Sequence, residues 1–200
     1  MGFLQQKWFS FFFIFIGSHA IGQIKILPEQ LLSEYVQVKS VTGNEAPAGK
    51  FLLEKCHEAG LYTHIFNDEI NSFNFTASLY PLEKGKPNIV FHTHCDVVYE
   101  GDSSKWTYPP YSGTITDSAV WGRGAIDNKA LAVMEFLAIS EFADTAKTTE
   151  LPFNVTLLVV SNEEEGGKLG AGIIVNNYLE FLNPVVVFGE GGSGAKNVLA

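Results

Sequence analysis

The chain has 200 residues, of which 46% are hydrophobic and 18% charged, and this composition excludes disordered and fibrous proteins. Thirteen lysines and arginines stand against 22 aspartates and glutamates, giving a formal net charge of −9, and no basic cluster offers a site for nucleic acid. The length predicts one domain, or one domain and part of a second. Two cysteines, Cys56 and Cys95, are too few for a disulfide framework, although they could pair with each other.

The first 22 residues have the layout of a secretory signal peptide. Lys7 gives a short polar start one positive charge, and an almost unbroken apolar run follows over Trp8–Ile16. The small residues Ser18 and Ala20 suit cleavage after Ala20, and a cut after Gly22 fits equally well. The run is shorter than the ~20 apolar residues that cross a bilayer. We therefore expect a secreted or periplasmic protein with no stable membrane span once the signal is removed.

Helices and apolar strands alternate along the rest of the chain. This alternation predicts an α/β fold in which helices flank a central mixed, mainly parallel sheet. The two apolar strands nearest the carboxyl end are of the kind that a sheet buries on both faces. In chain order we expect helices over Pro28–Ser40 and Ala46–Ala59, strands over Tyr62–Phe66, Phe73–Tyr80 and Asn88–His92, a hairpin over Gly113–Ile115 and Val120–Gly122, a strongly amphipathic helix over Asn128–Phe142, a strand over Phe153–Val160, a helix over Gly170–Leu182 and a strand over Val185–Phe188.

Residues that carry chemistry follow the predicted strands. His92, His94 and Asp96 stand at alternate positions at the end of one strand, so an extended backbone places them on one face. An imidazole beside a carboxylate at the carboxyl end of a strand suits a metal ligand with a group that orients it. Asp127 follows a glycine-rich turn at the start of the long helix, where it either caps the helix or bridges two cations.

Carboxylates follow two further apolar strands. Glu163, Glu164 and Glu165 come directly after one strand, and Glu190 comes directly after the next. Open α/β sheets bind ligands at the carboxyl ends of their strands, and a dication would remove the repulsion between adjacent carboxylates. Carboxylates combined with imidazole favour zinc, with cobalt or manganese as alternatives. Two metals that share Asp127 would lie about 3.5 Å apart.

The order of these motifs resembles the co-catalytic zinc peptidase family that includes carboxypeptidase S, aminoacylase and the acetylornithine and succinyl-diaminopimelate deacylases. The resemblance runs from about residue 31 to residue 192, and Trp106–Gly113 is most similar to the carboxypeptidase S branch. It implies a phosphorylase/hydrolase-like catalytic domain truncated at its C-terminal side. Residues 23–200 would be the N-terminal part, without the C-terminal part and the small dimerisation or lid domain. The matching motifs are Ser40–Glu45, His94-x-Asp96, Trp106–Gly113, Gly122-Arg123-Gly124-x-x-Asp127-x-Lys129, Glu163-Glu164-x-Gly166 and Glu190-Gly191.

Carried over residue by residue, the resemblance implies a two-zinc enzyme that hydrolyses an amide or peptide bond. Its substrate would be a peptide that loses its C-terminal residue, or an N-acyl amino acid, and the full-length protein would form a homodimer. The implied roles are zinc binding by His94, Asp127, Glu164 and Glu190, with Asp127 bridging the two ions, orientation of His94 by Asp96, and general-base catalysis by Glu163 on water activated by zinc.

Several features depart from the family pattern, and Asn162 and Gly189 each stand where an aspartate is common. His92 stands where the family usually has a small residue, and we do not expect it to be a ligand. The family also uses histidines from the smaller domain and from near the carboxyl end, and no histidine follows His94 here. Two alternatives therefore stay open. One is a non-catalytic secreted module that binds a metal or a peptide on the same fold, and the other is an inactive fragment that lacks the last zinc ligand.

Other patterns in the chain are weaker. A metallo-β-lactamase would need a second histidine after Asp96, where Val97 stands, and a TIM-barrel amidohydrolase would leave the paired glutamates after the apolar strand unexplained. Asn74 and Asn154 begin sequences that fit the glycosylation pattern. Asn154 lies in a strand that we expect to be buried, so we interpret that match as chance.

Overall fold

The computed structural model describes residues 27–191, and the predicted signal peptide over residues 1–22 lies outside them. Most of the expected elements are found close to their expected bounds. In chain order the elements are α1 Pro28–Gln37, α2 Ala46–Glu58, β1 Tyr62–Glu69, β2 Ser72–Ser78, the 3-10 turn η1 Leu82–Lys84, β3 Asn88–His94, the 3-10 turn η2 Ser103–Lys105, β4 Thr114–Ile115, β5 Val120–Trp121, α3 Lys129–Ser140, α4 Ala143–Thr148, β6 Asn154–Val160, the 3-10 turn η3 Glu163–Glu165, α5 Ala171–Asn177, α6 Leu179–Leu182 and β7 Pro184–Gly189.

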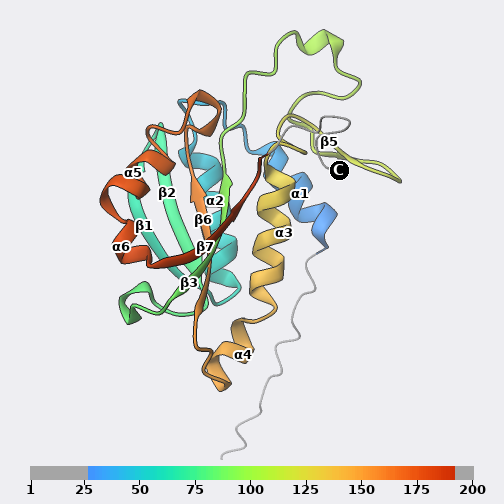
Figure 1. Cartoon of the computed structure of the whole chain (residues 1–200). Helices are drawn as coiled ribbons and strands as arrows, with labels where there is room; N and C mark the ends of the chain where they lie inside the picture. The colour runs from blue at the N-terminus through green and yellow to red at the C-terminus, as the bar shows by residue number, and fades with distance from the viewer. Residues whose placement is uncertain (1–26, 192–200) are drawn as a thin grey trace, which may run out of the picture.

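Within the described residues, five strands form one sheet in the order β1-β2-β6-β3-β7, and helices lie on both of its sides (Figure 1). β3 pairs in parallel with β6 and with β7, whereas β2 is antiparallel to both β1 and β6. In this described sheet β2 alone therefore runs against the others, which confirms the predicted mixed, mainly parallel α/β fold. The carboxyl ends of β3, β6 and β7 consequently meet at one edge of the sheet.

The larger core lies between the sheet and the helices α1, α2 and α3. Tyr35, Leu52, Phe73 and Phe136 are fully buried there. The packing of α2 on β2 is close, because a Cβ on Gly49 would lie only 2.4 Å from the Phe73 ring. A smaller core on the opposite face of the sheet holds the short helices α5 and α6. Both faces of β3 and β6 are thus covered, and this fixes the positions of the loops that follow these two strands.

The structure corrects three expectations about elements. The helix expected over Gly170–Leu182 is two short helices, α5 and α6, separated at Tyr178. The helix expected to be strongly amphipathic, α3, is apolar on most sides, since Phe136 is buried while Met134 is 59% exposed. The strand expected to be buried, β7, lies at the edge of the described sheet, and its residue Val185 is 64% exposed.

Two possible modifications, a disulfide and asparagine glycosylation, do not fit the structure. Cys56 and Cys95 are both buried as free thiols, so the possible disulfide between them does not form. Asn74 is fully buried and donates hydrogen bonds to the Asn67 side chain and to a backbone carbonyl, and Asn154 is buried too. A glycan could not be attached to either asparagine in this fold. Among the described residues, no helix has the length and apolar character needed to span a bilayer.

Candidate metal centre

Three carboxylates converge on the Nε2 atom of His94, the last residue of β3. The His94 side chain is fully buried, and its Nε2 lies 3.1 Å from Asp127 Oδ1 and 3.0 Å from Glu190 Oε1. Glu163 Oε2 lies 3.7 Å from the same nitrogen. Asp127 precedes α3, Glu163 follows β6 and Glu190 follows β7. The site therefore brings together four segments that are far apart in the sequence.

Asp96 holds the other side of the His94 ring. His94 Nδ1 lies 3.0 Å from the Asp96 carbonyl oxygen and 3.3 Å from Asp96 Oδ1. The fully buried Asp96 carboxylate also accepts hydrogen bonds from the backbone N–H groups of Glu163, at 3.1 Å, and Glu164, at 3.2 Å. The Thr42 hydroxyl donates a further hydrogen bond to Asp96 Oδ2 at 3.0 Å. Asp96 thus orients the imidazole and fixes the turn that carries the two glutamates.

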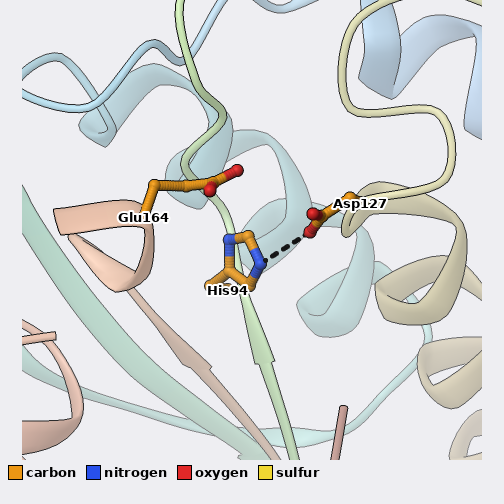
Figure 2. A group of neighbouring side chains, drawn as sticks. All are labelled: His94, Asp127 and Glu164. Carbon is orange, nitrogen blue, oxygen red and sulfur yellow. Dashed lines mark hydrogen bonds and ion pairs between the residues drawn. The ribbon is translucent and has the colours of Figure 1, made fainter. Parts of the chain in front are cut away.

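Among residues 27–191, two sets of side chains have the geometry to hold a metal ion. One set combines His94 with Asp127 and Glu164, the other combines His94 with Glu163 and Glu190, and the ligand atoms of each set lie within 4.8 Å of one another. Figure 2 shows the first set, with Asp127 directed at the ring nitrogen and Glu164 approaching from the other side of the ring. Imidazole with carboxylates is a ligand set that zinc, cobalt and manganese accept, so the residues fit a divalent metal.

The electrostatics of the site also suit a cation. Burial lowers the pKa of His94, but the hydrogen bond that its ring N–H donates to Asp96 and the charges of Asp96, Glu190 and Glu163 outweigh it and raise the pKa to about 9. Burial raises the pKa of Asp96, but the hydrogen bond and charge of His94 hold it below the usual range. Burial raises the pKa of Glu163 and of Glu164. The protein thus gathers negative charge around one imidazole, and a divalent cation would take the place of its proton.

Asn128 is a residue of the site to which the sequence analysis gave no role. Its buried side chain donates a hydrogen bond to Glu190 Oε2 and accepts one from the Thr93 hydroxyl. Asn128 is also the N-cap position of α3, so Asp127 does not cap that helix and its carboxylate is directed at His94 instead. The sequence offered one signal for Asn128, which is its place directly after Asp127. Thr42 lies within Ser40–Glu45, a segment that matches the family pattern.

Two residues near the centre stay outside it. His92 lies on β3 two positions before His94 but belongs to neither ligand set, and its Nε2 is buried without a hydrogen-bond partner among the described residues. Burial, together with the charge of His94, lowers the pKa of His92. Glu165 is exposed to solvent and accepts a hydrogen bond of 3.4 Å from the Asn162 side chain. Neither was expected to be a ligand.

The chain is similar in sequence to known proteins over most of its length. Residues 90–198 match the model of peptidase family M20/M25/M40. The chain is 31% identical over 163 residues to the succinyl-diaminopimelate desuccinylase of Ehrlichia canis, which covers 80% of this chain and 38% of that protein. The corresponding enzyme of Methylocella silvestris is 35% identical over 138 residues, covering 68% of this chain and 34% of that protein. The chain thus spans less than two fifths of the length of these relatives.

Solved structures share the fold. An M20 family metallo-carboxypeptidase from Sulfolobus solfataricus superposes with a TM-score of 0.70 and 23% identity, over 84% of this chain and 38% of that one. Human carnosine dipeptidase 1 superposes with a TM-score of 0.63 and 21% identity, over 81% of this chain and 37% of that one. Similarity at this level of identity concerns the fold alone.

Proposed function

The chain belongs to peptidase family M20/M25/M40, and on that premise we propose that it takes part in metal-dependent hydrolysis of an amide or peptide bond. The observation that carries the proposal is the convergence of Asp127, Glu163 and Glu190 on Nε2 of His94. Carboxylates crowded around one buried imidazole repel one another unless a cation lies between them. Their side chains are 33–64% exposed, so the centre is open to water and to a substrate.

A divalent ion at this centre would polarise the substrate carbonyl and make a water molecule more acidic. The protein supplies the proton transfers. Glu163 is 42% exposed and stands beside the ligand positions, where it can accept a proton from water and pass it to the leaving amine. Asp96 keeps the His94 ring in one orientation, and Asp127, Glu164 and Glu190 supply oxygen ligands.

The finer assignments rest on the resemblance and on the names of the relatives. We propose two zinc ions per site, bridged by Asp127, with cobalt or manganese as substitutes. Relatives named as desuccinylases support an N-acyl amino acid substrate, and neighbours named as a carboxypeptidase and a dipeptidase support a peptide. Export is a further proposal, which rests on the signal-peptide layout of the first 22 residues. A homodimer of the full-length protein is proposed from the resemblance alone.

The experiment compares the purified chain with its Glu163→Gln and Glu165→Gln variants. Zinc content is measured together with hydrolysis of an N-succinyl amino acid and of a dipeptide. We expect Glu163→Gln to keep its zinc and to lose activity by a factor of about 10²–10⁴, the usual contribution of a general base. Glu165→Gln removes the same charge from an exposed neighbouring position, and it should behave as the unmodified chain does.

Each contrary outcome has a distinct meaning. A chain that binds no zinc would refute the metal centre. Zinc binding without hydrolysis of either substrate would favour the two alternatives over an active enzyme, namely a non-catalytic metal-binding module on the same fold or an inactive fragment that lacks the last zinc ligand. Full activity in Glu163→Gln would show that a different group accepts the proton.

A further inference from the structure

Lys129 is a buried cation close to the candidate metal centre. It is the first residue of α3, two positions after Asp127, and its side chain has no exposed surface. Its ammonium group donates hydrogen bonds to the carbonyl oxygens of Val38, at 2.6 Å, and Tyr35, at 3.0 Å. The same group lies 4.8 Å from the centre of the Tyr35 ring. Because burial of a charge is costly, filling space in the core does not explain a lysine here.

The two carbonyl groups belong to the carboxyl end of α1. The last carbonyl groups of a helix lack the usual partner four residues on and carry partial negative charge. The Tyr35 carbonyl oxygen accepts one backbone hydrogen bond, from the Val38 N–H at 3.2 Å, and Lys129 adds a second. The last turn of α1 has no basic residue of its own, and Lys129 supplies the positive charge from α3. The two helices pack side by side (Figure 1), so this contact joins the end of one to the beginning of the other.

The Lys129 side chain also runs beneath the loop that precedes α3. A Cβ on Gly124 would lie 3.3 Å from Lys129 Cδ and 2.6 Å from Val97 Cγ1, so only glycine lets the loop come this close. The backbone N–H of Lys129 donates to the Gly124 carbonyl oxygen at 3.0 Å. Asp127 therefore sits in a short segment that is held at Gly124 and again at Lys129.

We infer that Lys129 is a positioning residue for Asp127, because its hydrogen bonds to the end of α1 fix the start of α3 and the loop that carries the Asp127 carboxylate. The inference rests on the proposed metal centre, since positioning matters only where Asp127 binds a cation. A lysine that merely stabilised the core would affect the free energy of unfolding, but it would have no selective effect on this loop.

The test compares Lys129→Met with Phe136→Leu, a change at a buried residue two turns further along α3. Hydrogen exchange of residues 122–128 is measured without metal, and zinc affinity is measured by calorimetry. We expect Lys129→Met to accelerate exchange in this loop and to weaken zinc binding by about tenfold, the lower end of the effect of groups that orient ligands. Phe136→Leu should lower global stability without either selective change. Lys129→Gln keeps a hydrogen-bond donor without the charge, and it replaces Lys129→Met if that variant does not fold.

Equal loop exchange and equal zinc affinity in the lysine and phenylalanine variants, at matched stability, would overturn the inference. If the unmodified chain binds no zinc, the proposed function fails, while hydrogen exchange still decides whether Lys129 holds the loop. Faster exchange with unchanged zinc affinity would show that the loop is held without any consequence for Asp127, which also contradicts the inference.

Discussion

Glu135 is a carboxylic acid in an apolar environment, which disfavours its charged form. It lies on α3 beside a pocket of about 540 Å³ that is otherwise lined by apolar residues such as Phe91 and Phe153. Its Oε2 is buried without a hydrogen-bond partner among the described residues. Burial, with a smaller contribution from the charge of Glu190, raises the pKa of Glu135 to about 8. The folded protein therefore favours the protonated form of this side chain, whereas the unfolded chain ionises it at a lower pH.

The sign of the resulting pH dependence follows from proton binding. Between the ordinary pKa of 4.5 and the folded value of about 8, the folded state binds more protons than the unfolded state, so stability falls as the pH rises through this range. Glu135→Gln cannot ionise, and at pH 8 we expect it to be more stable than the unmodified chain by about 1 kcal/mol, a figure reduced for solvent access. Urea midpoints near pH 4.5 should differ little between the two proteins. Glu141→Gln removes an exposed charge next to the same helix, and an equal gain there would rule out burial as the cause.

Among individual residues, the sequence predicted the candidate metal ligands and the general base better than it predicted the side chains that orient them. His94, Glu163 and Glu190 could be identified because each follows an apolar strand, and the carboxyl ends of such strands meet at one edge of a sheet. Thr42 and Asn128 received no role, because a hydroxyl or amide bonds to whatever the tertiary structure brings near it. Their partners are a carboxylate 54 residues away and one 62 residues away in the chain.

Gly170 shows how tightly the elements around the centre are joined. It precedes α5, and a Cβ there would lie 1.8 Å from the carbonyl oxygen of Ser161, which follows β6 directly. We expect Gly170→Ala to lower the free energy of unfolding by about 3 kcal/mol, the upper range for overpacking, because backbone atoms cannot rotate away. The displaced Ser161 should also shift Glu163 and weaken zinc binding.

The control for this prediction is Gly85→Ala. Gly85 has a left-handed φ of 60°, whereas Gly170 has a φ of −112°, and a Cβ on Gly85 would meet nothing within 4 Å. Gly85→Ala therefore measures the cost of an added methyl group in a left-handed turn without a steric contact. Chemical denaturation of both variants compares that cost with the cost of the contact with Ser161. Equal losses of stability would mean that the contact with Ser161 is not the cause.

The sequence analysis was wrong about α3 and β7. The burial of both elements depends on their neighbours in the fold, which the sequence does not specify. Apolar periodicity indicates that a helix buries one face, but α3 packs against both the sheet and α1, and so its apolar surface extends further around. An apolar run predicts a strand, but it does not distinguish a strand in the middle of a sheet from a strand at its edge. The runs that form β6 and β7 are alike in composition, yet β6 has a paired strand on each side and β7, among the described strands, has one.

At the scale of the whole molecule, the edge strand β7 of the described sheet exposes several neighbouring apolar side chains. β7 has the sequence Pro184–Gly189 without a charged residue, and Val185, Val187 and Phe188 are 64%, 54% and 51% exposed. Unprotected edges of this kind pair with other chains. We expect the 200-residue chain to self-associate as its concentration rises, and Val187→Lys to shift association to concentrations about tenfold higher, as measured by sedimentation velocity.

The control variant is Val175→Lys. Val175 lies on α5 and is 58% exposed, so the substitution adds the same charge to the molecule away from the edge strand. It should leave the association unchanged. If Val175→Lys shifts association to higher concentrations as much as Val187→Lys does, the added charge governs association, and the edge strand does not.

The position of β3 has a consequence for synthesis on the ribosome. β3 lies between β6 and β7 in the sheet, and both of these neighbours come after it in the chain. When His94 leaves the ribosome, neither strand that will flank β3 has been made, and at about 5–20 residues per second several seconds pass before β6 follows. The nascent chain must therefore carry β3 with both of its edges unpaired, and β3 acquires its second neighbour only when β7 has been translated.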